Sequence, residues 1–290
     1  MSGLIGVDWG TTNVRAYRFD GNGAVIERRS SPRGAATLAR EDFAGVLVET
    51  VGDWRDASTT PIVLAGMVGS RNGWREAPYL PCPVDPARLA SAGLRVETPI
   101  GAAVIVPGVS VTAADAIPSV MRGEETQLFG AGIRDGLVIL PGTHSKWVTM
   151  QAGKIVDFAT AMTGELYALL RDHSLLGQLA DATAAFDDAA FGLGVRRTLA
   201  AKSIVPLLFS ARADVLLGNL GPQHVASYLS GILIGGEIGA LGRGAATLIG
   251  APQLVGLYRT AFAIYGLHDI ATVDGDDAVA RGLWQIGEHL

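Results

Sequence analysis

Residues 4–20 read LIGVDWGTTNVRAYRFD, and the rest of the chain is understood most easily from this segment. An apolar run ends at Asp8, turns through the Gly-Thr-Thr of residues 10–12, and resumes at Val14 as an alternating strand. Backbone N–H groups and hydroxyls in such a turn form a concave anion site, and a neighbouring carboxylate can hold a hydrated cation. The segment therefore predicts two strands and, between them, a site for phosphate and Mg²⁺.

Residues 136–150 repeat this pattern, because they read GLVILPGTHSKWVTM. An apolar strand again ends in a polar turn, now Gly-Thr-His-Ser at residues 142–145, and an alternating strand follows. In both places a hairpin turn and a third strand come next. Two such units half a chain apart predict two similar domains, residues 1–130 and 131–290. We expect an α/β fold with mixed sheets flanked by helices and a nucleoside triphosphate in the cleft between the domains.

The composition limits the classes of partner. The chain has 290 residues, is 49% hydrophobic and carries a formal net charge of −5, without a basic stripe, so nucleic acid is not expected as a partner. The single cysteine, Cys82, cannot form an internal disulfide, and the N-terminus enters a strand directly, which predicts a cytoplasmic protein. The apolar segment at residues 229–241 contains Glu237 and is too short to span a membrane, so no membrane partner is expected.

The remaining segments follow an alternating order of helices and strands. Residues 40–54 have apolar positions at helical spacing, and residues 61–67 form a buried strand pattern. Residues 79–99 are rich in proline and predict an irregular surface segment. Helices with few strands are predicted from Thr163 to about residue 244. The last predicted elements are a strand at 246–252, a helix at 253–265, a strand at 269–273 and a helix at 276–287.

The segment GMVGSRNGW, residues 66–74, follows a buried strand, where α/β folds place ligands. Arg71 can fork onto a substrate carboxylate, and Trp74 can cover an apolar or sugar face. Ser70 and Asn72 add a hydroxyl and an amide. The alternative is a solvated loop whose arginine pairs with a neighbouring acid, and these residues alone leave both open.

Glu124 and Glu125 stand shortly before the second turn. Phosphoryl transfer to an alcohol needs one group to orient and deprotonate the hydroxyl, which a carboxylate can do. A glutamate pair is also typical of a solvated helix start, because acids favour the first turn. Near the end of the chain, Gly250 and Ala251 follow a strand and can admit a flat base, although the same pattern also fits a plain strand-to-helix connection.

Taken in order, these motifs resemble the actin/sugar-kinase/Hsp70 superfamily. Its parts are a first phosphate motif at residues 8–15, a second at 141–147, an adenosine motif at 248–252 and a closing helix at 278–287. Within the superfamily, the chain resembles the 2-dehydro-3-deoxygalactonokinase family over nearly its whole length. The blocks that carry the resemblance are DWGTTN at 8–13, GMVGSRNGW at 66–74, MRGEETQ at 121–127 and LPGTHSKW at 140–147. The resemblance implies two actin-like, ribonuclease H-like domains with a last helix that crosses back.

The resemblance also implies a reaction, the ATP-dependent phosphorylation of 2-dehydro-3-deoxy-D-galactonate at its terminal hydroxyl in galactonate catabolism. Asp8 would position Mg²⁺. Glu124 best matches the place of the base, with Glu125 in reserve and Asp115 left open. The carboxylate of the substrate would bind Arg71, or else Arg15 or Arg122, since arginine binds carboxylates through two parallel hydrogen bonds. The residues implied to bind ATP are Gly10, Thr11, Thr12, Asn13, Gly142, Thr143, His144, Ser145, Lys146, Gly250 and Ala251.

Other nucleotide-binding and metal sites fit the sequence poorly. The chain contains neither a Gly-x-x-x-x-Gly-Lys-Ser/Thr loop nor a Gly-x-Gly-x-x-Gly turn between strand and helix, and its five histidines lack metal-site spacing. The alternatives left open are a kinase of the same superfamily for another sugar acid, a phosphatase, and an ATP-binding sensor without catalysis. A homodimer is compatible with the sequence, which leaves the oligomeric state and the stereochemistry of the acceptor open.

Overall fold

The computed structural model describes residues 3–54, 60–112, 117–242 and 244–290. The chain forms two compact units. Unit 1 contains Met1–Gly136, Val148–Ala159 and Val273–Leu290, and unit 2 contains Leu137–Trp147 and Thr160–Thr272. The chain therefore passes between the units several times, and its last helix belongs to unit 1. The single domain boundary near residue 130 stays a prediction.

The first sheet contains six strands in the order β3-β2-β1-β4-β7-β6. Strand β1 pairs antiparallel with β2 and parallel with β4, and β4 pairs parallel with β7. The polar turn expected after the first strand joins β1 to β2. The strands are β1 (Leu4–Trp9), β2 (Val14–Phe19), β3 (Val25–Ser31), β4 (Ile62–Gly66), β6 (Leu94–Thr98) and β7 (Gly101–Ile105).

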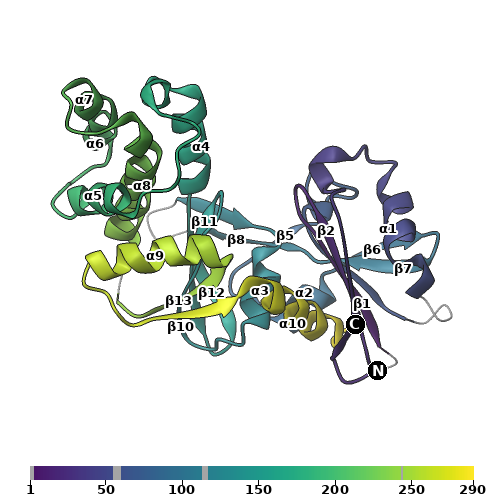
Figure 1. Cartoon of the computed structure of the whole chain (residues 1–290). Coiled ribbons are helices and arrows are strands. Elements are labelled where there is room, and N and C mark those ends of the chain that lie inside the picture. The colour runs from purple at the N-terminus through teal and green to yellow at the C-terminus, as the bar shows by residue number, and fades with distance from the viewer. Residues whose placement is uncertain (1–2, 55–59, 113–116, 243) are drawn as a thin grey trace. The chain divides into compact units, whose positions relative to one another are not determined.

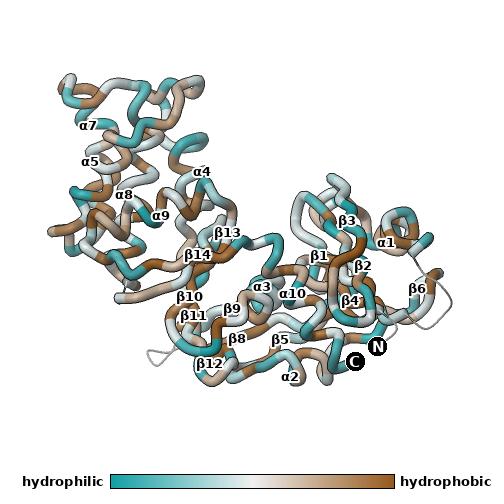
Figure 2. The backbone as a smooth tube through the Cα atoms, turned by 60° about the horizontal axis from the view of Figure 1, so that its bottom comes forward, coloured by the Kyte–Doolittle hydropathy of each residue, from teal (hydrophilic) through white to brown (hydrophobic). Residues whose placement is uncertain are grey.

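The second sheet repeats this arrangement, with the order β12-β11-β10-β13-β14. As β1 does in the first sheet, β10 lies between the second strand of its hairpin and a parallel partner, here β13. Figure 2 colours hydrophobic segments brown, and those of β10 and β13 can be followed in this sheet. The strands are β10 (Gly136–Leu140), β11 (Ser145–Gln151), β12 (Lys154–Ala161), β13 (Ala246–Gly250) and β14 (Ile270–Asp274). The internal duplication read from the sequence is thus present in the strand order.

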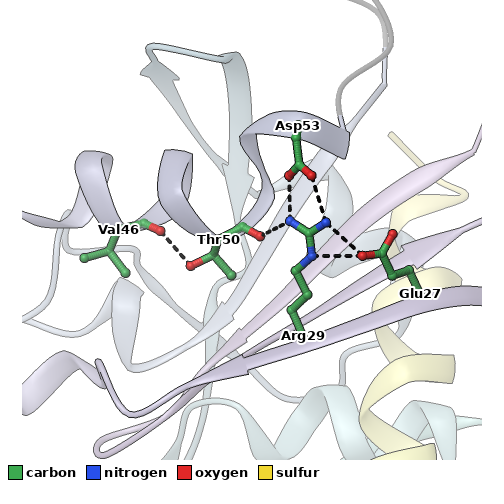
Figure 3. Close-up of polar contacts among 5 residues, drawn as sticks. All are labelled: Glu27, Arg29, Val46, Thr50 and Asp53. Carbon is green, nitrogen blue, oxygen red and sulfur yellow. Dashed lines mark hydrogen bonds and ion pairs between the residues drawn. The ribbon is translucent and has the colours of Figure 1, made fainter.

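Helix α1 (Phe43–Val51) covers the first sheet with the buried side chains Phe43, Val46, Leu47 and Val51, which recur at helical spacing. The short helix η2 (Gly52–Trp54) extends it. Figure 3 shows how Arg29 of β3 holds both helices, because its guanidinium contacts Asp53, Glu27 and the carbonyl oxygen of Thr50. The same guanidinium lies 4.4 Å from the ring centroid of Trp54.

The prediction of an irregular segment at residues 79–99 is wrong. The segment holds β5 (Tyr79–Pro81), helix α2 (Pro86–Ser91) and β6, and β5 belongs to a third sheet with β8 (Gly108–Thr112) and β9 (Pro118–Met121). The side chain of Asp85 caps α2 by accepting from the N–H of Arg88, and Pro86 occupies the first turn. Pro86 therefore begins a helix and Pro81 ends a strand, so proline does not mark a continuous loop here.

Unit 2 is rich in helices, as the sequence predicts. Helix α8 is buried on most of its surface and joins two clusters of apolar side chains, one against the second sheet and one among the helices. Figure 1 shows α5 and α8 close together, with α9 between them and β13. The helices are α4 (Thr163–His173), α5 (Asp188–Thr198), α6 (Val205–Leu208), α7 (Ser210–Leu216), α8 (Val225–Leu241) and α9 (Pro252–Ile264).

Helices α3 (Glu124–Gly130) and α10 (Gly275–Gly287) cross closely in unit 1. A Cβ added to Gly282 would lie 1.8 Å from the carbonyl oxygen of Thr126, and one added to Gly130 would lie 1.8 Å from that of Ala278. The two backbones therefore touch at a point that side chains would block. Because α3 begins with the glutamate pair, this crossing fixes the place of both carboxylates.

Candidate functional site

Two glycines bring the ends of β1 and β4 and the start of α3 together. Gly66 ends β4 with a φ of 88°, and Gly123 precedes α3 with a φ of 102°. Other residues rarely adopt these values. A Cβ on Gly123 would lie 3.3 Å from the Cα of Gly66, and a Cβ on Gly66 would lie 3.3 Å from Oδ1 of Asp8. Asp8 and the glutamate pair therefore share one small region of unit 1.

Asp8 lies at the end of β1, and its side chain is only 17% exposed. Arg15 of β2 stands opposite it in the sheet and places Nη1 at 3.6 Å from both Asp8 and Asp276. The pKa of Asp8 is raised to about 6, mainly by burial and in part by the charges of Asp276 and Glu124, while Arg15 opposes the shift. A cation at this carboxylate would remove the cost of its charge, which is consistent with the predicted metal role.

The glutamate pair begins α3, as expected for a helix start, but only one of its two side chains is accessible to solvent. Glu125 is fully buried and accepts the N–H of Gly123 with both oxygens, at 2.9 and 2.7 Å. Burial, then the charge of Glu124, raises the pKa of Glu125 to about 7. Glu124 is half-buried and accepts the N–H of Arg122 at 2.9 Å. The less enclosed carboxylate, that of Glu124, is thus the more accessible of the two.

The first polar turn presents its side chains to solvent. Thr11, Thr12 and Asn13 are exposed, and the N–H of Gly10 closes the turn onto the carbonyl oxygen of Asn13 at 2.9 Å. The carbonyl oxygens of Gly10, Thr11 and Thr12 accept hydrogen bonds from the backbone at residues 34–36. With its carbonyls occupied, the turn offers donor groups and hydroxyls, which suit an anion.

The segment at residues 66–74 divides into a buried and an exposed part. Trp74 is 7% exposed and stacks on Phe43 in the core, with ring centroids 6.3 Å apart. From this position Trp74 cannot cover a sugar face, so the expectation that it contacts the substrate is corrected. Arg71 and Asn72 are exposed and Ser70 is half-buried, so these three remain accessible candidates.

Arg122 lies beneath the same segment. Its Nη2 donates to the carbonyl oxygen of Ala77 at 2.7 Å, and its guanidinium lies 4.4 Å from the ring centroid of Tyr79. Its Nε and Nη1 are buried and have no hydrogen-bond partner among the described residues. A Cβ on Gly69 would lie 2.8 Å from Nη1, so the loop backbone covers this atom. In this structure Arg122 supports the loop from below.

The second polar turn, at residues 142–145, differs from the first. Thr143 and His144 are exposed, and His144 contacts Glu165 of α4. Ser145 is fully buried and its Oγ lies 2.9 Å from the hydroxyl of Tyr258, so it is not directly available to a phosphate as expected. Lys146 is 3% exposed, and its Nζ donates to the carbonyl oxygen of His144 at 2.9 Å. The exposed donors of this turn are therefore at Thr143 and His144.

A pocket of about 450 Å³ opens beside the second turn within unit 2. Its walls are mostly apolar with a few hydroxyls, which is typical of sites for flat ring systems. Gly250 ends β13 and Ala251 caps the neighbouring helix α9, of which other residues line the pocket. The lining residues are Gly142, Thr143, Thr163, Gly164, Tyr167, Phe186, Ser230, Leu233, Ile234, Leu254, Leu257 and Tyr258.

The sequence analysis did not predict some of the residues that lie at these sites. Asp276 joins Asp8 and Arg15 from a helix more than 250 positions away, and acids at a helix start are too common to give a signal of this. Glu237 gave a signal, because an isolated acid in the apolar helix α8 needs partners. Asp115, the third candidate base, lies outside the described residues. Across the described part of the chain, no helix is both long and apolar enough to cross a membrane.

Comparison with known proteins agrees with this architecture. Residues 8–286 match the family model for 2-keto-3-deoxy-galactonokinase. The chain is 41% identical over 294 residues to the 2-dehydro-3-deoxygalactonokinase of Escherichia coli (strain K12), covering 99% of this chain and 98% of that protein. A crystal structure from Sinorhizobium meliloti named for the same enzyme superposes with a TM-score of 0.89 at 36% identity, covering 98% of each chain. The α/β fold with mixed sheets and flanking helices is confirmed, and the chain belongs to the 2-keto-3-deoxy-galactonokinase family.

Proposed function

We propose that the protein transfers the γ-phosphoryl group of ATP to the terminal 6-hydroxyl of 2-dehydro-3-deoxy-D-galactonate. The products are 2-dehydro-3-deoxy-6-phosphogalactonate and ADP, and the reaction is a step of galactonate catabolism. The observation that carries the proposal is the family match over residues 8–286, within which the carboxylates of Asp8, Glu124 and Glu125 lie in one region. A relative at 41% identity bears the name of this enzyme.

In the proposed reaction, Glu124 orients the 6-hydroxyl and accepts its proton. The hydroxyl oxygen forms a bond to the γ-phosphorus as the bond to the oxygen of ADP breaks. Glu125 holds the turn before α3 through the N–H of Gly123, and remains the second candidate for the base. Positioning and electrostatic stabilisation provide most of the rate in such a transfer.

The polar turns are the proposed phosphate-binding segments, Gly10 to Asn13 in unit 1 and Gly142 to Lys146 in unit 2. Asp8 would hold Mg²⁺ directly or through water. No three His, Cys, Asp or Glu side chains of the described residues form a metal cluster. A single carboxylate such as that of Asp8 suits Mg²⁺, because this ion usually keeps several waters and binds one or two carboxylates together with substrate phosphates. When bound, the ion neutralises charge on the phosphate oxygens.

For the substrate carboxylate we keep Arg71 as the first candidate, because its side chain is exposed next to Ser70 and Asn72. Arg15 is the second, although two carboxylates already lie 3.6 Å from it. The guanidinium of Arg122 is covered by the loop, which makes it the third. The pocket beside the second turn, with Gly250 and Ala251, is the proposed site of the adenine base.

A coupled ADP-release assay with Mg-ATP tests this function. The acceptors to compare are 2-dehydro-3-deoxy-D-galactonate, its gluconate epimer, free hexoses and no acceptor. ADP release with the galactonate compound alone supports the proposal. ADP release with another sugar acid would indicate a kinase of the same superfamily with a different acceptor. Phosphate release without an acceptor would identify a phosphatase, and ATP binding without either product would identify a sensor. We also propose a cytoplasmic location, and the homodimer stays a prediction for sedimentation analysis.

A further inference from the structure

A buried polar cluster lies directly beneath the second turn. Oγ of Ser145 lies 2.9 Å from the hydroxyl of Tyr258, and that hydroxyl donates to Oε2 of Glu237 at 2.6 Å. Nε1 of Trp147 donates to Oε1 of the same carboxylate at 2.6 Å. The four residues come from β11, α8 and α9, and each is less than 9% exposed. One carboxylate thus ties two helices to the strand that begins at the turn.

Tyr258 contacts both the pocket and the second turn. Tyr258 is one of the residues that line the pocket of about 450 Å³, with Leu254 and Leu257, and its hydroxyl reaches Ser145 at the end of the turn. A molecule that fills the pocket therefore packs against the same side chain that holds the turn. Leu254, Leu257 and Tyr258 all belong to α9, so a shift of this helix would move both features together.

The start of α4 holds the turn from another direction. Thr163 hydrogen-bonds to Glu237, and the N–H of Glu165 donates to the carbonyl oxygen of Thr143 at 3.0 Å. A Cβ on Gly164 would lie 2.6 Å from the carbonyl oxygen of Gly142, so the backbones of α4 and the turn are in direct contact. Glu237 on α8 therefore contacts side chains of β11, α9 and α4, three elements that lie at or next to the turn.

Glu237 is an unusual residue for an apolar helix. Desolvation raises its pKa, and its hydrogen bonds to Thr163, Tyr258, Trp147 and Ser145 oppose this shift. A buried carboxylate is costly unless such partners satisfy it, and the partners in turn are fixed by it. The arrangement has a cost that simple packing of α8 on α9 does not require, which suggests a role beyond stability.

We propose that Glu237 and Tyr258 are positioning residues that align the turn at residues 142–145 when the pocket is filled. This inference rests on the proposed function, in which the pocket takes the base of a nucleotide and the turn takes its phosphates. Base recognition by the ring of Tyr258 would then be coupled to phosphoryl transfer through its hydroxyl. A nucleotide without a well-seated base would bind but transfer its phosphate slowly.

The substitution Tyr258→Phe tests the coupling, because it keeps the ring in the pocket and removes only the hydroxyl. Tyr265→Phe is the matched control. Its hydroxyl is also hydrogen-bonded within unit 2, to Thr198 at 2.7 Å and to the carbonyl oxygen of Gly235 at 2.8 Å, but it lines neither the pocket nor the turn. We expect Tyr258→Phe to lower kcat about tenfold while the affinity for adenosine stays within about twofold. Tyr265→Phe should leave kcat unchanged.

Two kinetic results would overturn the inference. Equal losses of kcat in both tyrosine variants would show a general structural effect, and an unchanged kcat in Tyr258→Phe would show that its hydroxyl has no such role. Should Tyr258→Phe fail to fold, Ser145→Ala removes the same contact from the other side and should give the same pattern. In the double variant the two losses should not add, because they break one contact.

The affinities for ADP and adenosine separate this inference from the proposed function. If the wild-type protein releases no ADP with any acceptor, the proposed function fails, and calorimetry can still measure how much the phosphates add to adenosine binding. The inference expects that phosphate contribution to fall in Tyr258→Phe and to persist in Tyr265→Phe. If adenosine affinity falls as much as ADP affinity, the variant has only distorted the pocket and the inference is wrong.

Discussion

Glu124 and Glu125 are neighbours in sequence, yet the fold gives them different surroundings. The turn before α3 buries Glu125 completely and uses both of its oxygens, whereas Glu124 stays half-buried with one backbone contact. The charge of Glu124 also contributes to the raised pKa of Glu125. We therefore propose Glu124 for the proton transfer, with Glu125 as the second candidate.

Replacing Glu124 with Gln should lower kcat about 10²- to 10⁴-fold, since the amide cannot accept the proton of the 6-hydroxyl. The affinity for ATP should change little. Steady-state kinetics with calorimetric ATP titration would measure both, and Glu97→Gln, on the exposed face of β6, is the control. Retained turnover would move the base to Glu125 or Asp115.

Replacing Glu125 with Gln should change how stability depends on pH. Burial raises the pKa of Glu125 from 4.5 to about 7, so the folded protein keeps a proton that the unfolded chain loses first. The stabilisation from this proton is complete below a pH of about 4.5 and is lost as the pH rises through about 7. Relative to wild type, the variant should gain about 1–3 kcal/mol between about pH 5 and pH 8 in denaturant unfolding. A constant difference would show that Glu125 titrates normally.

Replacing Arg71 with Ala should raise KM for the sugar acid by about 10- to 100-fold, because a hydrogen bond between charged groups contributes about 1.5–3 kcal/mol. The value of kcat should change less, since the contact is present before and during the transfer. Arg75→Ala removes an exposed arginine directly after the segment at residues 66–74 and should leave KM unchanged. An unaltered KM in Arg71→Ala would exclude it as the carboxylate partner.

At the scale of elements, the crossing of α3 and α10 is the most demanding contact in unit 1. Gly282→Ala should lower the free energy of unfolding by about 1–3 kcal/mol or more, because the new methyl group overlaps the backbone of α3. Gly256→Ala is the control, since its Cβ meets nothing within 4 Å on the exposed side of α9, and it should stabilise by about 0.5–1 kcal/mol. Chemical unfolding of both variants measures this. Equal effects would show that the crossing adapts.

Local sequence patterns were sufficient to predict those elements whose own residues determine their secondary structure. The turn between β1 and β2, the buried strand β4 and the helix α1 follow directly from periodicity and turn residues. The segment at residues 79–99 was misread because proline was taken as a breaker, although Asp85 before Pro86 is a helix start signal. Burial of Trp74 and Ser145 could not be read locally, because either residue type serves equally in a core and in a binding site.

At the scale of the whole molecule, the two compact units allow ligand effects to be mapped separately. Adenosine should slow amide hydrogen exchange around the pocket, in the segments 142–145, 163–167, 230–234 and 254–258. Binding to the folded state suppresses local opening by mass action, by about 2.7 kcal/mol at a hundredfold excess over Kd. Exchange measured by mass spectrometry would show this, with guanosine as the comparison. Protection confined to other segments would place the base elsewhere.

The interleaving of the units affects how the protein is made. Helix α10 packs on β1 and on Phe19, where its Trp284 lies with ring centroids 5.7 Å apart. The ribosome therefore completes all of unit 2 before it supplies the helix that covers the first sheet. A nascent chain keeps the apolar side chains of Leu4 and Phe19 uncovered for most of its synthesis. Chains that stop before Gly275 should thus leave the first sheet without α10, and chaperones and proteases should remove them.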